Sequence, residues 1–310
     1  MLLRHSSSFC CRSDKRSVPL LAAPLKFGNL RQEQHICRAV ATNPAKSRHQ
    51  LASGTGLEVI GLESAQGSRY PPLIFLHGSY HAAWCWQDKF LPYFHAAGFG
   101  VFAVSLRGQE VIASLDQAPI LISHSLGGLI AQRYMVRLGE GEEHRPALRG
   151  LALLCSMPPS GNTGTAGRIM KNTPLLGVRL TWGFITKSFL RSKSACREMF
   201  FSNDLPEADI DRYQQLFRAE AGKVPVVDVK ALNSNLPLPR PCSLHCPVLV
   251  LGCSNDRIVD RQGVEETAAH FGAQAVMLPD LAHDLMLDTR WQQAADALLQ
   301  WMQAEMLLEN

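Results

Sequence analysis

The stretch "PILISHSLGGLIAQRYM" (residues 119–135) constrains the fold more than any other part of the sequence. Its first half, "ILIS", is a short apolar run rich in β-branched residues, which predicts a strand buried on both faces. Its second half, "LGGLIAQRYM", repeats large apolar residues at helical spacing and therefore predicts an amphipathic helix. Only His124 and Ser125 separate the two elements, so the chain must turn sharply at a serine.

Two interpretations of this turn are open. In the first, Ser125 is an ordinary helix N-cap, and the glycines that follow it only ease close packing. In the second, the turn is a nucleophile elbow of the form G-x-S-x-G, in which a strained backbone projects the serine hydroxyl above the sheet. The elbow requires small residues two before and two after the serine. These positions hold Ser123 and Gly127, so a serine replaces the first glycine of the motif.

Composition places the chain among globular proteins and argues against nucleic-acid binding. At 310 residues and 46% hydrophobic content, it can form one large α/β domain or two small ones. The net charge of +4 is unevenly distributed, because residues 1–48 carry a local charge of +7. The remaining 262 residues carry −3, so their net charge gives no reason to expect nucleic-acid binding.

Residues 1–48 are rich in Ser and Arg, poor in acids, and lack the continuous apolar core of a secretory signal. This composition predicts an organellar transit peptide, with a disordered tail as the alternative. The sequence "ICRAVAT" (residues 36–42) resembles a plastid processing site more than a mitochondrial one. We therefore expect a chloroplast protein, with the mitochondrion as the second possibility.

After this leader, apolar strands alternate with helical segments, which predicts a doubly wound, mostly parallel α/β sheet. The strand pattern stops between Pro158 and Pro241, where the sequence is helical and irregular. We expect the first part of a core over residues 49–157, a helical lid over 158–241, and the second part of the core over 242–310. The most apolar run of the lid, "PLLGVRLTWGFITKSFL", is interrupted by Arg179 and Lys187, so an amphipathic helix is expected rather than a membrane span.

Chemically active side chains follow four of the predicted strands. They stand in "FLHGSYHAAWCW", "SHSLGG", "GCSNDRIVD" and "DLAHDLMLD", and chemistry in such sheets collects at the carboxyl ends of the strands. A serine hydrolase needs a nucleophile, a base, a carboxylate that orients the base, and donors for an oxyanion. All four occur here, in the chain order Ser–Asp–His, which is the order in α/β-hydrolases.

Residues 55–308 resemble the α/β-hydrolase superfamily, and "HGSYHAAWCW" is similar to the oxyanion loop of plant methylesterases and hydroxynitrile lyases. The resemblance implies Ser125 as nucleophile, His283 as base and Asp256 as the orienting carboxylate. It also implies that the backbone amides of Ser79 and Leu126 form the oxyanion hole.

Several neighbours compete for these roles. Asp260 and Asp284 are alternatives to Asp256, which we prefer because it follows its strand by about four residues; Asp284, adjacent to His283, is expected to point away. Substrate-pocket candidates are Tyr80, His81 and His124. His81 can equally be a loop histidine satisfied by its neighbours, and Trp84 and Trp86 are expected in the core rather than under a substrate.

The connection between "SLRGQ" and "PILIS" is short, with only residues 110–118 between them. The family usually places a full crossover helix there. We expect this shortened crossover to leave part of an apolar sheet face exposed and to weaken the scaffold.

Together these features predict a serine hydrolase that cleaves an ester-like small molecule through an acyl-enzyme, without metal or organic cofactor. A carbon–carbon lyase of the hydroxynitrile-lyase type, and an inactive or purely binding protein with this fold, are the alternatives. No nucleic-acid partner and no stable membrane span are expected, and the oligomeric state is left open.

Overall fold

The computed structural model describes residues 44–50, 56–64, 70–104, 117–140, 147–221 and 236–305. By its internal contacts the chain divides after Arg38, and all described residues belong to the second unit. The expected leader therefore lies almost entirely outside the described residues.

The described residues form one eight-stranded sheet with the order β1-β2-β4-β3-β5-β6-β7-β8. Its strands are β1 (Ala45–Gln50), β2 (Gly56–Leu62), β3 (Leu73–Leu76), β4 (Val101–Val104), β5 (Ile120–His124), β6 (Gly150–Leu154), β7 (Val248–Cys253) and β8 (Ala275–Leu278). The pairs β1–β2 and β2–β4 are antiparallel, and all other neighbours are parallel. This confirms the predicted doubly wound, mostly parallel sheet.

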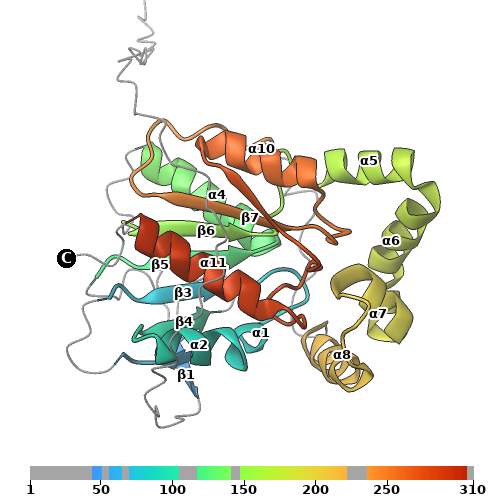
Figure 1. Ribbon diagram of the computed structural model, residues 1–310, viewed down its shortest axis with the longest axis horizontal. Helices are drawn as coiled ribbons and strands as arrows, with labels where there is room; N and C mark the ends of the chain where they lie inside the picture. Colours follow the sequence, from blue (N-terminus) through green and yellow to red (C-terminus); the bar gives the residue numbers. More distant parts are fainter. Residues whose placement is uncertain are drawn as a thin grey trace, which may run out of the picture. The chain divides into compact units, whose positions relative to one another are not determined.

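Helices cover both faces of the sheet (Figure 1). They are α1 (Trp84–Gln87), α2 (Phe90–Ala96), α4 (Leu126–Gly139), α10 (Arg261–Phe271) and α11 (Trp291–Ala304). α4 packs on β5 and β6 and α10 on β7 and β8, while α2 packs on β4 and against α11. Every residue of β3, β5 and β6 is buried, as expected for strands with helices on both sides.

A helical insertion separates β6 from β7. It contains α5 (Thr163–Asn172), α6 (Pro174–Thr186), the short 3₁₀ helix η1 (Ser188–Leu190), α7 (Lys193–Phe200) and α8 (Glu207–Ala221). These helices lie together at one end of the sheet (Figure 1). None of the helices in the described ranges is long and apolar enough to cross a membrane.

Two expectations about the chain before the nucleophile strand need correction. The leader was expected to extend to residue 48, but Ala45–Gln50 pairs with β2 as strand β1. A sheet face was expected to be exposed, but nearly all side chains of β3, β4 and β5 are buried, because α1 and α2 cover β4 and α4 covers β5. The short crossover itself falls mainly on residues 105–116, outside the described ranges.

Candidate active site

The turn between β5 and α4 holds Ser125 in a strained backbone conformation. Its φ of 53° and ψ of −120° lie where residues other than glycine are rare. The hydroxyl of Ser125 makes no cap hydrogen bond to the amides of α4. The N-cap interpretation is therefore wrong, and the hydroxyl is free to interact with groups above the sheet.

Two glycines allow close approach at this turn: Gly127 two residues after the serine, and Gly78 in the loop after β3. A Cβ atom on Gly127 would lie 2.4 Å from the carbonyl oxygen of His77, and one on Gly78 would lie 2.8 Å from Cβ of Ser125. Ser123, in contrast, fits the position that glycine usually holds. Its side chain is fully buried, and its Oγ has no hydrogen-bond partner among the described residues.

Ser125, His283 and Asp256 form a continuous hydrogen-bonded chain. Oγ of Ser125 lies 3.0 Å from Nε2 of His283, and Nδ1 of His283 lies 2.8 Å from Oδ2 of Asp256. Since the carboxylate can only accept, Nδ1 carries the proton and Nε2 is left as the acceptor for the hydroxyl of Ser125. The three residues come from β5–α4, the loop after β7, and the loop after β8, which all end at the same edge of the sheet.

Local hydrogen bonds fix the carboxylate of Asp256. Its second oxygen, Oδ1, accepts from the backbone amides of Ile258 at 2.7 Å and Val259 at 2.9 Å. Its side chain is fully buried. The orientation of the carboxylate toward His283 is thus set by the turn in which it lies.

Asp260, one of the two alternatives to Asp256, holds α10 and α5 together. It caps α10 through the amide of Gly263 at 2.9 Å and binds Arg168 with both carboxylate oxygens, at 2.5 and 2.7 Å. It therefore has a structural role away from Ser125.

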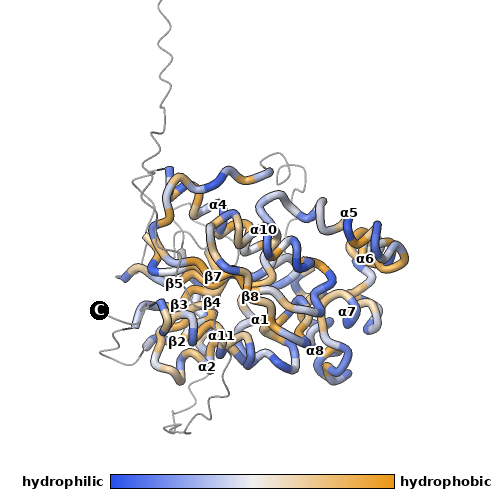
Figure 2. Tube along the Cα trace, turned by 45° about the horizontal axis from the view of Figure 1, so that its top comes forward, coloured by the Kyte–Doolittle hydropathy of each residue, from blue (hydrophilic) through white to orange (hydrophobic). Residues whose placement is uncertain are grey.

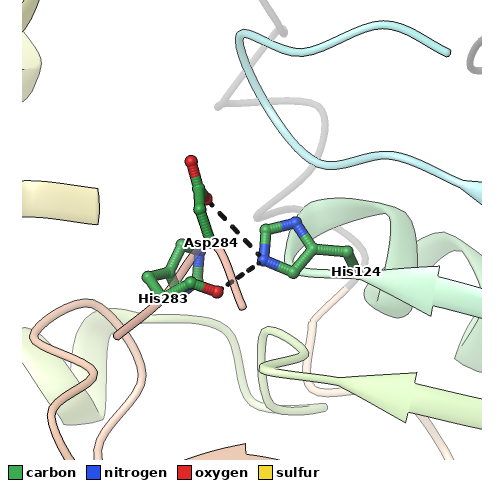
Figure 3. A group of neighbouring side chains, drawn as sticks. All are labelled: His124, His283 and Asp284. Carbon is green, nitrogen blue, oxygen red and sulfur yellow. Dashed lines mark hydrogen bonds and ion pairs between the residues drawn. The ribbon is translucent and has the colours of Figure 1, made fainter. Parts of the chain in front are cut away.

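Asp284, the other alternative, was expected to point away, but one of its carboxylate oxygens lies within 4.8 Å of a ring nitrogen of His283; its hydrogen bond goes to His81 instead. Its Oδ2 lies 2.9 Å from Nε2 of His81, whose Nδ1 donates to the carbonyl of Ser79 at 2.7 Å. The other oxygen of this carboxylate, Oδ1, faces His124 (Figure 3). Nε2 of His124 lies 3.9 Å from this oxygen and donates a hydrogen bond to the backbone carbonyl of His283 at 2.9 Å. His81 and His124 are 2% and 0% exposed, so we expect both to support the site rather than to touch a substrate.

The histidines of the site differ in basicity. Burial lowers the pKa of His283, but the charge and hydrogen bond of Asp256, helped by the charge of Asp284, outweigh it and raise the pKa above 6.5. Burial lowers the pKa of His77 to about 4. Burial, together with the neighbouring His283 and His81, holds the pKa of His124 well below 6.5. His283 is therefore the histidine of the three that can both accept and release a proton near neutral pH.

The backbone amides of Leu126 and Ser79, expected to form an oxyanion hole, stay a prediction that two local features support. Leu126 is the first residue of α4, and amides in the first turn of a helix have no partner within the helix. Ser79 lies in the loop after β3, which His81 fixes through its hydrogen bond to the Ser79 carbonyl. The helix dipole of α4 adds positive potential at the same point.

Tyr80 lies between the oxyanion loop and the helical insertion. It has a positive φ of 65°, is half-buried, and its ring centre lies 5.0 Å from that of Phe189 and 6.4 Å from that of Phe184. Of the two tryptophans that follow, Trp86 is fully buried in the core as expected, and Trp84 stacks on Tyr213 of α8. Of the three pocket candidates, Tyr80 is therefore the one whose side chain is not fully buried.

Two groups of side chains near Ser125 contain enough ligand atoms for a metal ion, and His283 belongs to both. Both ring nitrogens of His283 already hold hydrogen bonds to Ser125 and Asp256. The second group also needs Cys155, and burial raises the pKa of this thiol well above its ordinary value. A thiol must lose its proton to bind a metal, so the arrangement suits proton transfer better than metal binding.

The link from Asp284 through His81 to Ser79 is the part of the site that the sequence did not predict. From the sequence, His81 is either a pocket residue or a loop histidine satisfied by its neighbours, and Asp284 is an alternative to Asp256 that is expected to point away. No sequence motif links His81 to Asp284, because the two residues lie in loops that are far apart in the chain. Only the small residues around the turn in "HGSYH" hinted that the loop is held in a fixed shape.

Comparison with known proteins agrees with this geometry. The model of the alpha/beta hydrolase family matches residues 73–297. No curated protein matches the chain. Similar solved structures include an alpha/beta hydrolase fold protein from Burkholderia ambifaria, with 14% identity, a TM-score of 0.54, and coverage of 82% of this chain and 97% of that chain.

Two further similar structures are esterases. A thermophilic esterase from Thermogutta terrifontis is 18% identical, with a TM-score of 0.55 and coverage of 84% of this chain and 98% of that chain. A carboxylesterase structure from Nitrososphaera gargenis is 16% identical, with a TM-score of 0.55 and coverage of 84% and 99%. At these identities the likeness establishes a shared fold.

Proposed function

Because this chain belongs to the alpha/beta hydrolase family, we propose that it is a serine hydrolase that cleaves ester-like small molecules. The observation that carries the proposal is the hydrogen-bonded chain from Ser125 through His283 to Asp256, which begins at a strained turn. A strained serine bonded to a histidine that a buried carboxylate orients is the arrangement that activates a hydroxyl as a nucleophile.

In the proposed reaction, Oγ of Ser125 attacks the ester carbonyl while Nε2 of His283 takes the hydroxyl proton. Asp256 stabilises the imidazolium that forms and keeps the ring in place. The amides of Leu126 and Ser79 stabilise the oxyanion of the tetrahedral intermediate. Collapse of this intermediate transfers the proton from His283 to the leaving alcohol and leaves an acyl group on Ser125.

Hydrolysis then repeats the sequence with water as the nucleophile. His283 removes a proton from water, the hydroxide attacks the acyl carbonyl, and the proton returns to Oγ of Ser125 as the acid leaves. The residues of this chain supply every proton transfer in the cycle. We propose that the helical insertion acts as a lid, since Phe184 and Phe189 contact Tyr80 next to the nucleophile.

A fluorophosphonate probe, which reacts only with an activated serine, tests the proposal. The purified protein should be labelled, and a panel of p-nitrophenyl esters should show turnover that the probe abolishes. Labelling without ester turnover, together with release of cyanide from cyanohydrins, would indicate the lyase alternative. Absence of labelling in a folded protein would show that the site is inactive.

The similar solved structures support ester substrates in a general way, since two of them are esterases. Turnover across the ester panel would define the size and polarity of the acyl and alcohol groups that the site accepts. We also propose that the basic leader directs the protein to chloroplasts, on the composition of residues 1–48.

A further inference from the structure

Large apolar side chains are exposed along one face of α6. Leu175, Val178, Trp182 and Ile185 are 69%, 56%, 64% and 72% exposed. They recur at helical spacing, so they form one continuous stripe, which we call the α6 stripe. In the described part of the chain only two other large apolar side chains are exposed, Met170 on the neighbouring α5 and Leu244.

The orientation of α6 is the reverse of that of an ordinary surface helix. The residues that it buries are Gly177, Leu180 and Gly183. A Cβ atom on Gly183 would lie 2.8 Å from Sδ of Met199, and one on Gly177 would lie 3.0 Å from Cα of Met170. The helix therefore packs on the protein through two glycines together with Leu180 and the half-buried Leu176 and Phe184, and it turns the four residues of the stripe outward. Figure 2 shows α6 in the hydrophobic colour at the side of the molecule away from the sheet.

The segment around the stripe is strongly basic. Residues 161–197 contain seven Lys and Arg residues and no Asp or Glu. Arg179 pairs with Glu198, and Lys193 with Asp211. Lys171, Lys187 and Arg191 form no ion pair with any carboxylate of the described residues. Lys171 precedes α6 and Lys187 follows it, so free cations stand at both ends of the α6 stripe.

We propose that the α6 stripe docks onto an anionic lipid surface, with the helix lying in the plane of the interface. Such a helix combines an apolar face containing Trp with flanking Lys and Arg, and this combination favours the boundary between lipid headgroups and acyl chains. α6 has only 13 residues and is interrupted by Arg179, so it lies on a bilayer and does not cross it.

The shape of the surface favours lipid over a protein partner. A stable protein interface buries about 800 Å² on each side and has a polar rim of both charges. The α6 stripe lies on a single helix. Glu198 next to it is held in ion pairs with Arg179 and Arg257, whereas the charges without an ion pair among the described residues at its two ends, Lys171 and Lys187, are both positive. A second copy of this chain would bring the same positive charge to the interface, which opposes a symmetric dimer at this face.

Vesicle flotation with the full chain tests the proposal, using phosphatidylcholine vesicles with and without about 30% phosphatidylserine. The parent protein should float with the anionic vesicles and much less with the neutral ones. Trp182→Ser combined with Ile185→Ser should lower the partition coefficient about a hundredfold, since each lost side chain accounts for about tenfold. Lys187→Gln combined with Arg191→Gln should lower it at least tenfold on anionic vesicles only.

Matched controls separate the stripe from surface changes in general. Leu244→Ser removes an exposed apolar side chain outside α6, and Arg240→Gln with Arg261→Gln removes two exposed cations elsewhere. Both controls should float like the parent. Because the altered side chains are exposed, apart from the half-buried Lys187, all variants should keep the melting temperature of the parent.

Two results would overturn the proposal. If the variant with Trp182→Ser and Ile185→Ser floats like the parent, the basic leader and not α6 binds the vesicles. If light scattering shows that the parent dimerises without lipid and that this variant is monomeric, the stripe is a contact between copies of the chain. Ser125→Ala should bind vesicles like the parent, so the docking surface and the proposed catalytic function can fail independently.

Discussion

Oδ2 of Asp284 lies 2.9 Å from Nε2 of His81, although Asp284 directly follows the proposed base His283 in the chain. His81 in turn donates from Nδ1 to the carbonyl of Ser79 at 2.7 Å. Asp284 therefore fixes the loop that carries one proposed oxyanion donor, while Asp256 fixes the base. The two carboxylates near His283, Asp256 and Asp284, thus have separate roles, and substitutions at each can distinguish these roles.

Asp284→Ala should lower the free energy of unfolding by about 3–5 kcal/mol, because it leaves the buried Nε2 of His81 without a partner. Asp284→Asn should cost much less, since its amide can donate to Nε2 while His81 keeps its proton on Nδ1. Urea unfolding monitored by fluorescence would give both values. Equal losses in the two variants would show that the charge of Asp284, not its hydrogen bond, holds the loop.

Ser125→Ala should abolish fluorophosphonate labelling and lower kcat by several orders of magnitude, because the proposed nucleophile is gone. Ser123→Ala is the matched control two residues earlier. It should keep labelling and leave stability unchanged or slightly higher, since its buried hydroxyl has no partner among the described residues. Loss of labelling in both variants, or in neither, would contradict the assignment of Ser125.

Gly127→Ala should disrupt the turn itself. The new Cβ atom would meet the carbonyl oxygen of His77 at 2.4 Å, and this backbone atom cannot move without shifting β3 or α4. We expect a loss of several kcal/mol in stability and no labelling. Gly272→Ala is a useful control, because nothing lies within 4 Å of the added atom and only its positive φ of 63° opposes the change. Its cost should be limited to backbone strain of about 1 kcal/mol.

The elements that carry the proposed chemistry could be predicted from the sequence because each has a local signal. The apolar strands and the turn at Ser125 follow from residue type and spacing. His283 and Asp256 follow from the resemblance to the α/β-hydrolase superfamily, and the place of Asp256 about four residues after its strand favours it over its neighbours. β1 was not predicted, because "AKSRHQ" is polar on both faces and forms an exposed edge strand. The outward direction of the α6 stripe was also not predictable, since helical spacing does not tell which face packs on the protein.

The boundary of the leader can be tested by truncation. A chain that begins at Asn43 keeps β1 and should melt like the full chain. A chain that begins at His49 loses most of the pairing of β1 with β2, including the ion pair between Lys46 and Glu58 at 3.4 Å. Because β1 is an exposed edge strand, we expect the second truncation to cost only about 1–3 kcal/mol.

Residues 1–43 fused to a fluorescent reporter should send it to plastids. A reporter found in mitochondria or secreted would refute the chloroplast proposal.

The raised pKa of His283 predicts how activity and stability depend on pH. Burial opposes the charged ring, but the charge and hydrogen bond of Asp256 outweigh burial, so the folded protein binds this proton more tightly than the unfolded chain does. The proposed base must be neutral to accept a proton from Ser125, so kcat/KM should rise with pH through a pKa above 6.5.

The same proton stabilises the folded state below pH 6.5, and this contribution is lost as the pH rises through the folded pKa. Asp256→Asn removes the charge that raises this pKa. It should lower kcat/KM by about four orders of magnitude, because the ring loses its orientation. The acid limb of the remaining activity should move to lower pH, and the fall in stability above pH 6.5 should shrink. pH–rate profiles and urea unfolding at several pH values measure both effects. An unchanged acid limb in Asp256→Asn would mean that another carboxylate orients His283.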